Sequence, residues 1–278
     1  MDMLRRIDEI WEEIEAGEAE KALLTAREVA EQNPREPAAL LALAAASWAN
    51  ESVEECRTAA EHAISVLRVQ KAAEEKSQLA YAIGWLARVE WRLWHFRKAE
   101  DHLREALELG PEHPWLWELL AQILERTNRR EEAAAADRRA QRLDEEHYPL
   151  PARFSREEAE AALQEALDAL PEEFQSAAGE VPIVLEEFPA LRMARAEVAG
   201  ELPLAPDILG LFFGVSLADR SFFHSFEPPG AIFLFQGNLE RMCGDRQTLV
   251  EEIAITLEHE LAHYLGFDES AMPGLGLD

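Results

Sequence analysis

The chain has 278 residues, 48% of them hydrophobic, which is enough to bury the cores of two domains or of one large one. Its 55 acidic residues against 27 lysines and arginines give a formal net charge of -28, which disfavours nucleic acids and acidic membrane surfaces as partners. No stretch is long and apolar enough to span a bilayer, and the N-terminus has no apolar run of signal-peptide length, so we expect a cytoplasmic protein.

The first half of the chain repeats a pattern of small residues. The pattern occurs four times, and its first small residue stands at 22, 56, 99 and 133, so neighbouring occurrences lie 34, 43 and 34 residues apart. In the clearest correspondence, Ala22, Ala26, Val29 and Pro34 recur as Ala99, Leu103, Ala106 and Pro111. Small residues at fixed helical positions let two helices approach closely, so the pattern predicts helix pairs that stack on one another.

A period of about 34 residues with this pattern resembles the tetratricopeptide repeat, or TPR. Two clear copies occupy residues 79–112 and 113–146, and two degraded copies occupy 2–35 and 36–76. The resemblance implies an all-α, TPR-like solenoid over residues 1–147, with a groove that binds a peptide or protein segment. A plain helical bundle is the alternative that the periodicity leaves open.

Tryptophans are concentrated in this half of the chain. They could line a groove or pack between helices, and packing is the favoured interpretation. The residues concerned are Trp85, Trp91, Trp94, Trp115 and Trp117.

Pro149 and Pro151, in the stretch YPLPARFS, end the helical pattern. Ser155 followed three residues later by Glu158 is the signature of a capping box at the start of the next helix, which should stop at Pro171. Three strands are then expected, in VPIVLEEF (181–188), ILGLFFGVSL (208–217) and AIFLFQG (231–237), with a loop over 189–207.

A short helix or turn in NLERMCGD precedes a long helix in DRQTLVEEIAITLEHELAHYL. An apolar stripe marks this long helix, formed by Val250, Ile253, Leu257 and Leu261 and widened by Ala254 and Ile255. The order helix, strands, helix predicts a second domain of α+β class over residues 155–278. The two cysteines, Cys56 and Cys243, fall in different predicted domains, which disfavours a disulfide.

The long helix carries the motif H-E-x-x-H as His259, Glu260 and His263. Residues four apart project from the same helical face, so both imidazoles can reach one metal ion. Glu260 lies about 100° round the helix from His259 and can approach a water at the metal without being a ligand. The pattern predicts a zinc site with Glu260 as general base.

The third ligand must lie nearby or upstream, because only fifteen residues follow His263. Gly266 can adopt a left-handed conformation that turns the chain back toward the metal. An acidic residue just past this turn, Asp268 or Glu269, could then reach the ion, and His224 is a distant upstream candidate.

The spacing resembles H-E-x-x-H-x-x-G-x-x-D, the signature of Asp-type zincins, whose last acid is the third ligand. Glu269 stands at that final position here, so it is the expected ligand, although the family pattern has Asp at this position. Asp268 is the alternative. The wider stretch of residues 155–278, including LGLFFGV and AIFLFQGNLERMCGDRQTLVEEIAITLEHELAHYLGFDES, is similar to the bacterial minimal zincins. That resemblance implies a small mixed sheet, one Zn²⁺ per chain, and an extended substrate bound along AIFLFQG or LGLFFGV.

These features predict a zinc-dependent metallopeptidase whose TPR array recruits a protein or peptide. Two other functions remain open. The chain could be a TPR adaptor whose zincin domain binds metal but does not cleave, or the zinc could simply brace the C-terminal helix.

Overall fold

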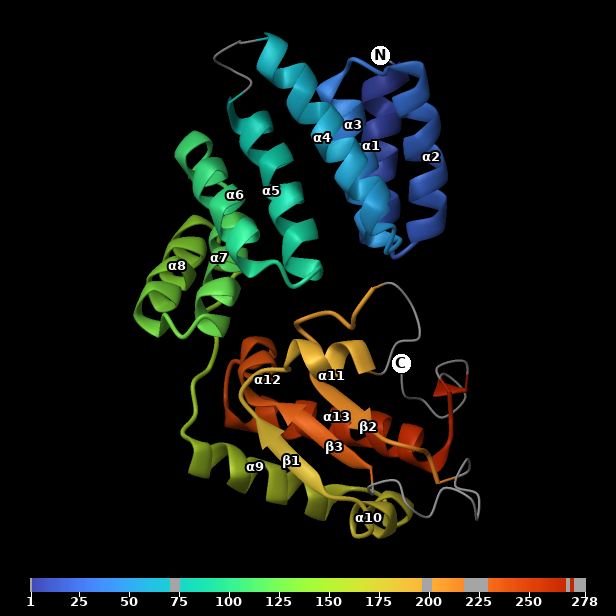
Figure 1. Cartoon of the computed structure of the whole chain (residues 1–278), viewed down its shortest axis with the longest axis vertical. Helices are drawn as coiled ribbons and strands as arrows, with labels where there is room; N and C mark the ends of the chain where they lie inside the picture. The colour runs from blue at the N-terminus through green and yellow to red at the C-terminus, as the bar shows by residue number, and fades with distance from the viewer. Residues whose placement is uncertain (1, 71–75, 197–201, 218–229, 269–270, 273–278) are drawn as a thin grey trace. The chain divides into compact units, whose positions relative to one another are not determined.

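The structure is a computed structural model, and it describes residues 2–70, 76–196, 202–217, 230–268 and 271–272 (Figure 1). The chain forms two compact units, Met1–Tyr148 and Pro149–Asp278. None of the helices in the described ranges combines the length and apolar character of a membrane span.

The first unit is built from consecutive helices that form four pairs. Short turns separate the two helices of a pair, and each helix contacts the next one along the chain. The helices are α1 (Asp2–Glu15), α2 (Ala19–Gln32), α3 (Pro37–Ala49), α4 (Val53–Gln70), α5 (Lys76–Arg92), α6 (Phe96–Leu109), α7 (Pro114–Arg126) and α8 (Arg130–Leu143). The predicted TPR-like helical repeat is confirmed.

The small residues of the repeat pattern lie where helices meet. Ala22, Ala26, Ala99 and Ala106 are all fully buried, with 0% of their surface exposed. Their short side chains allow the backbones of paired helices to approach, and the larger Leu103 of the same pattern is fully buried as well.

The second unit combines helices with a small sheet. Its elements in chain order are α9 (Arg156–Ala169), α10 (Glu172–Ala178), β1 (Ile183–Glu186), α11 (Leu191–Ala196), β2 (Gly210–Phe213), β3 (Ala231–Phe235), α12 (Gln236–Met242) and α13 (Arg246–Leu265). The core lies between the sheet and the helices α9 and α13, where Ile232, Leu234 and Leu257 are fully buried.

The three strands form a mixed sheet in the order β1-β3-β2. β1 pairs with β3 in parallel, and β2 pairs with β3 in antiparallel orientation, with Phe212 opposite Ile232. The predicted small mixed sheet is therefore confirmed. Because β3 is the central strand, AIFLFQG cannot supply a free edge for substrate, whereas β2, within LGLFFGV, lies at an edge.

Three details differ from the sequence-based expectations. The stretch 189–207 is not wholly a loop, because α11 occupies Leu191–Ala196, and α10 follows Pro171 directly. Ile255 does not widen the buried stripe of α13, since 55% of its surface is exposed. Short helices carry too few periodic positions to be recognised from sequence, and the burial of one residue depends on which neighbour covers it.

The segment before α9 is attached to the second unit. The amide of Ala152 donates to the carbonyl of Cys243, and the amide of Phe154 donates to the Glu240 carboxylate at 3.1 Å. Arg153 forms an ion pair with the same carboxylate at 3.1 Å, and Glu240 is buried, with 5% exposure. The capping box of Ser155 and Glu158 then begins α9 as predicted.

Candidate metal centre

The helix α13 begins and ends with well-defined caps. The Asp245 carboxylate accepts a hydrogen bond from the Thr248 amide at 2.9 Å, which satisfies one of the unpaired donors of the first turn. At the other end Gly266 adopts a positive φ of 105° and its amide donates to the carbonyls of Ala262 and His263. This left-handed cap is the turn that the sequence predicted, and it fixes where the chain leaves the helix.

The two histidines of the motif converge. The Nε2 atoms of His259 and His263 lie 3.2 Å apart, and the ring centroids are 4.8 Å apart with the planes at 78°. On the far side of its ring, the Nδ1 of His263 lies 3.1 Å from the Phe267 carbonyl oxygen. A carbonyl oxygen can only accept, so this contact assigns the ring proton to Nδ1 and leaves the Nε2 lone pair facing His259.

Glu260 connects α13 to the edge strand. Its side chain is only 7% exposed, and its Oε2 accepts a hydrogen bond of 2.6 Å from the Phe212 amide in β2. A charged carboxylate that is largely removed from water needs such a donor. The neighbouring Glu258 carboxyl has its pKa raised above the ordinary value by desolvation.

Gly210 provides the room for this contact. A Cβ at this position would stand 2.5 Å from Cγ2 of Thr256 and 2.9 Å from Cγ of Glu260, both closer than van der Waals contact allows. The glycine in β2 therefore lets α13 pack directly on the strand.

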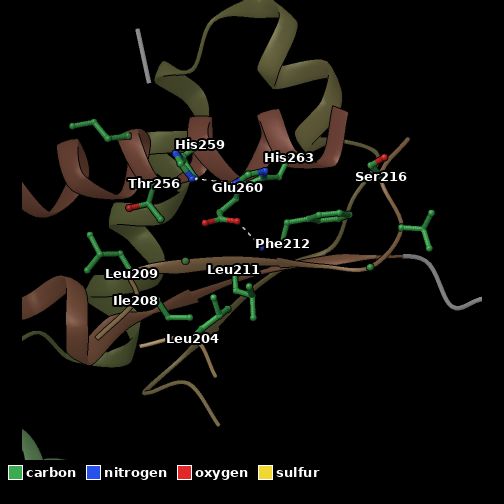
Figure 2. A pocket seen from close by; sticks show the side chains of 14 residues that line it. Leu204, Ile208, Leu209, Leu211, Phe212, Ser216, Thr256, His259, Glu260 and His263 are labelled. Carbon is green, nitrogen blue, oxygen red and sulfur yellow. Dashed lines mark hydrogen bonds between the residues drawn. The ribbon is translucent and has the colours of Figure 1, made fainter. Parts of the chain in front are cut away.

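These side chains line a cleft of about 670 Å³ along β2 (Figure 2). The labelled side chains of Thr256, His259, Glu260 and His263 come from α13 and lie over the strand. Apolar side chains make most of the remaining wall: Leu204, Ile208, Leu209, Leu211, Phe212, Val215 and Ile255. The cleft thus places two imidazoles and one carboxylate beside β2, an edge strand of the sheet.

The structure brings together three of the residues that the sequence predicted for the site, namely His259, Glu260 and His263. Glu269, the expected third ligand, and His224 lie outside the described residues. Asp268 is described and exposed. Over the described ranges, no group of three or more His, Cys, Asp or Glu side chains is arranged to hold a metal ion.

Sequence reasoning missed two contributors to the site, the Phe212 amide and Gly210. The amide leaves no trace in the side-chain sequence. Gly210 had a signal, because a glycine inside an apolar strand often marks the close approach of another element, here α13.

Comparison with known families gives one match in each unit. Residues 178–277 match the zincin-like metallopeptidase family, and residues 82–123 match the tetratricopeptide repeat. No curated protein matches the chain.

Several solved structures resemble about half of the chain at low similarity. TTC0263, a thermophilic TPR protein in Thermus thermophilus, is 18% identical over 51% of this chain and 75% of that chain, with a TM-score of 0.42. The MamA RS-1 ArsTM double mutant is 14% identical over 54% and 79%, with a TM-score of 0.37. YrrB, described as a TPR protein with an unusual peptide-binding site, is 14% identical over 51% and 86%, with a TM-score of 0.24.

The helical repeat of the first unit and the H-E-x-x-H helix beside the mixed sheet of the second agree with these family matches. The chain therefore carries a zincin-like metallopeptidase domain preceded by a tetratricopeptide-repeat region.

Proposed function

We propose that the second unit is a zinc-dependent peptidase and that the TPR array recruits a protein or peptide to the chain. The observation that carries the proposal is the convergence of His259 and His263 in one cleft with the buried carboxylate of Glu260. The edge of β2 runs along the same cleft, where an extended peptide could bind.

The two imidazoles fit a zinc ion. Tetrahedral zinc with Zn–N bonds of 2.0–2.1 Å holds two nitrogen ligands roughly 3.3 Å apart, and the Nε2 atoms of His259 and His263 are 3.2 Å apart. Histidine ligands usually donate their other ring N–H to a carbonyl or carboxylate, as His263 does to Phe267. His259, His263 and Glu269 would hold one Zn²⁺ per chain, with Asp268 as the alternative third ligand.

Zinc supplies Lewis-acid chemistry and makes water a competent nucleophile near neutral pH. Glu260 acts as the general base, taking a proton on its carboxylate and passing it to the amine that leaves. The Phe212 amide holds Oε2 of this carboxylate and fixes its orientation in the cleft. The side chain therefore has few orientations to sample before the proton moves.

The edge of β2 supports binding of substrate as an added strand. The amide of Phe235 donates to the carbonyl of Leu209, whereas the amide of Phe212 turns away from β3 to Glu260. Backbone groups of successive residues alternate in direction along an antiparallel strand, so Gly210 and Phe212 face the free edge. An extended peptide could pair with the backbone of Gly210 and with the carbonyl of Phe212, since the Phe212 amide is held by Glu260, while its side chains contact the apolar wall of the cleft.

The first test compares wild type with Glu260→Gln and with Glu258→Gln as the matched control on the same helix. Each protein is incubated with a broad peptide library, and its zinc content is measured. Glu260→Gln should keep about one zinc per chain and lose hydrolysis, while Glu258→Gln should keep both. A wild type that binds zinc but cleaves no peptide would instead favour a metal-binding TPR adaptor.

A structural zinc site would give a different result. It would have four protein ligands and no position for water, so zinc removal would lower stability without affecting any hydrolysis. We also propose a cytoplasmic location, which the two unpaired cysteines support because disulfides are rare in that compartment.

A further inference from the structure

A buried polar side chain of the second unit does not line the cleft but holds one of its walls. Asn238, on α12, is only 3% exposed. Its side-chain amide donates to the carbonyl of Ile208 at 2.7 Å and to that of Pro206 at 3.1 Å. A buried amide that binds two carbonyls of one segment restricts the path of that segment.

The segment that Asn238 holds is irregular and leads directly into β2. Irregular backbone needs partners for its polar groups outside a helix or a strand ladder. At one end the amide of Leu204 donates to the carbonyl of Ala194 at 3.0 Å, and at the other the carbonyl of Leu209 accepts from the amide of Phe235 at 2.9 Å. Asn238 holds the stretch between these two points of attachment.

This segment forms part of the apolar wall of the cleft. Leu204, Ile208 and Leu209 all line it (Figure 2). The next residue, Gly210, packs against the side chain of Glu260, so the wall begins directly beside the proposed general base. Among the described residues, no Lys or Arg lines the cleft. A wall of this kind favours an uncharged, apolar side chain of the substrate.

We propose that Asn238 is a positioning residue that gives the peptidase site its preference for an apolar substrate side chain. By holding the carbonyls of Pro206 and Ile208 it keeps the wall in one position, so a side chain that enters the cleft meets a preformed surface. Asn238 does not touch the substrate and acts only through this wall. The inference rests on the proposed function, because it concerns the same cleft.

The test uses two zinc-binding probes, so that the natural substrate need not be known. The probes are peptide hydroxamates that differ in one side chain next to the hydroxamate, isobutyl in one and methyl in the other. Calorimetry on the full chain gives Kd for both probes, and zinc content is measured on each protein. The variants are Asn238→Ala, Asn238→Asp and Ile208→Ser, which changes the wall itself. Ser155→Ala is the matched control, because it removes a cap of the same unit without touching the wall.

Wild type should bind the isobutyl probe about tenfold more tightly than the methyl probe. Both Asn238 variants and Ile208→Ser should keep their zinc and their affinity for the methyl probe but bind the two probes almost equally. Ser155→Ala should keep the wild-type ratio, although it unfolds at a lower urea concentration.

A purely structural role of Asn238 would lower the urea midpoint and leave the ratio of the two Kd values unchanged. That result, equal binding of both probes by wild type, or loss of the folded second unit in both Asn238 variants would each overturn the inference. Wild type without zinc would contradict the proposed function itself and remove the basis of this inference with it.

Discussion

The Phe212 amide and the Glu260 carboxylate are joined by a hydrogen bond of 2.6 Å, which ties the edge strand to the helix that carries both histidines. The bond satisfies a buried acceptor and an edge-strand donor at once. Its geometry depends on how closely α13 packs on β2, and Gly210 sets that distance.

Gly210→Ala should therefore damage both stability and activity. The added methyl group would meet Thr256 and Glu260, and such overpacking costs about 1–3 kcal/mol. Gly244→Ala is the matched control, because a Cβ at Gly244 meets no atom within 4 Å. All seven tryptophans lie in the first unit, so tryptophan emission reports the unfolding of that unit alone. For Gly210→Ala, the emission transition in urea should be unchanged, while circular dichroism, which also reports the second unit, should show an earlier transition. Equal unfolding curves for both variants would contradict the packing role.

His259→Ala and His263→Ala should each lower the zinc content well below one ion per chain, because each removes one of three expected protein ligands. His147→Ala, which removes an exposed histidine paired with Asp144, serves as the control and should keep zinc. Metal analysis after exhaustive dialysis measures the difference. Full zinc content in both motif variants would show that the metal lies elsewhere.

The third ligand can be assigned by substitution. Glu269→Ala should weaken zinc binding strongly, whereas Asp268→Ala should leave the zinc affinity near that of wild type. Glu269→Asp should keep the zinc affinity that Glu269→Ala loses, since aspartate stands at that position in Asp-type zincins. Competition with a fluorescent zinc chelator gives the three affinities. Loss of zinc in Asp268→Ala but not in Glu269→Ala would assign the ligand to Asp268.

Ser155→Ala should destabilise the second unit by about 1 kcal/mol. The Ser155 hydroxyl accepts from the Glu158 amide at 3.2 Å and the Glu158 carboxylate accepts from the Ser155 amide at 2.7 Å, so the variant loses half of a reciprocal cap. Hydrogen exchange of the α9 amides should increase, whereas Ser176→Ala in α10 should have no effect on them. Unchanged protection of α9 would mean that packing alone holds the helix start.

Neither cysteine should react with iodoacetamide in the folded protein at pH 8. Burial raises the pKa of the Cys56 thiol to about 12 and that of the Cys243 thiol to about 12, so almost no thiolate exists at that pH. Both should react once urea unfolds the chain, and mass spectrometry counts the adducts. Because folding raises both thiol pKa values, the free energy of unfolding should also fall as the pH rises above the ordinary thiol pKa, where only the unfolded chain can ionise its thiols. Fast alkylation of the native protein would contradict this burial.

The sequence predicted those parts of the molecule that depend on local patterns. Small residues at helical spacing identified the repeats, short apolar runs identified the strands, and His259 and His263 at a spacing of four identified the candidate site. The order of the strands depends on long-range pairing, which has no local signature, so the edge strand could not be chosen between β2 and β3. The contact between Glu260 and Phe212 was missed for the same reason, because one partner is a backbone group 48 residues away in the chain.

The partners of Glu240 have a practical consequence for producing the second unit alone. A fragment that starts at Ser155 would lack the donors from Arg153 and Phe154, so the buried Glu240 carboxylate would keep only the hydrogen bond from Gln236 among the side-chain and amide donors named here. The Arg153 side chain is 46% exposed and Gln236 still donates to the Glu240 carboxylate at 2.8 Å, so losing these two donors costs about 1–3 kcal/mol, still a sizeable share of a domain's total stability. Expression of the isolated unit should therefore begin at Pro149, where the segment that covers Glu240 is retained.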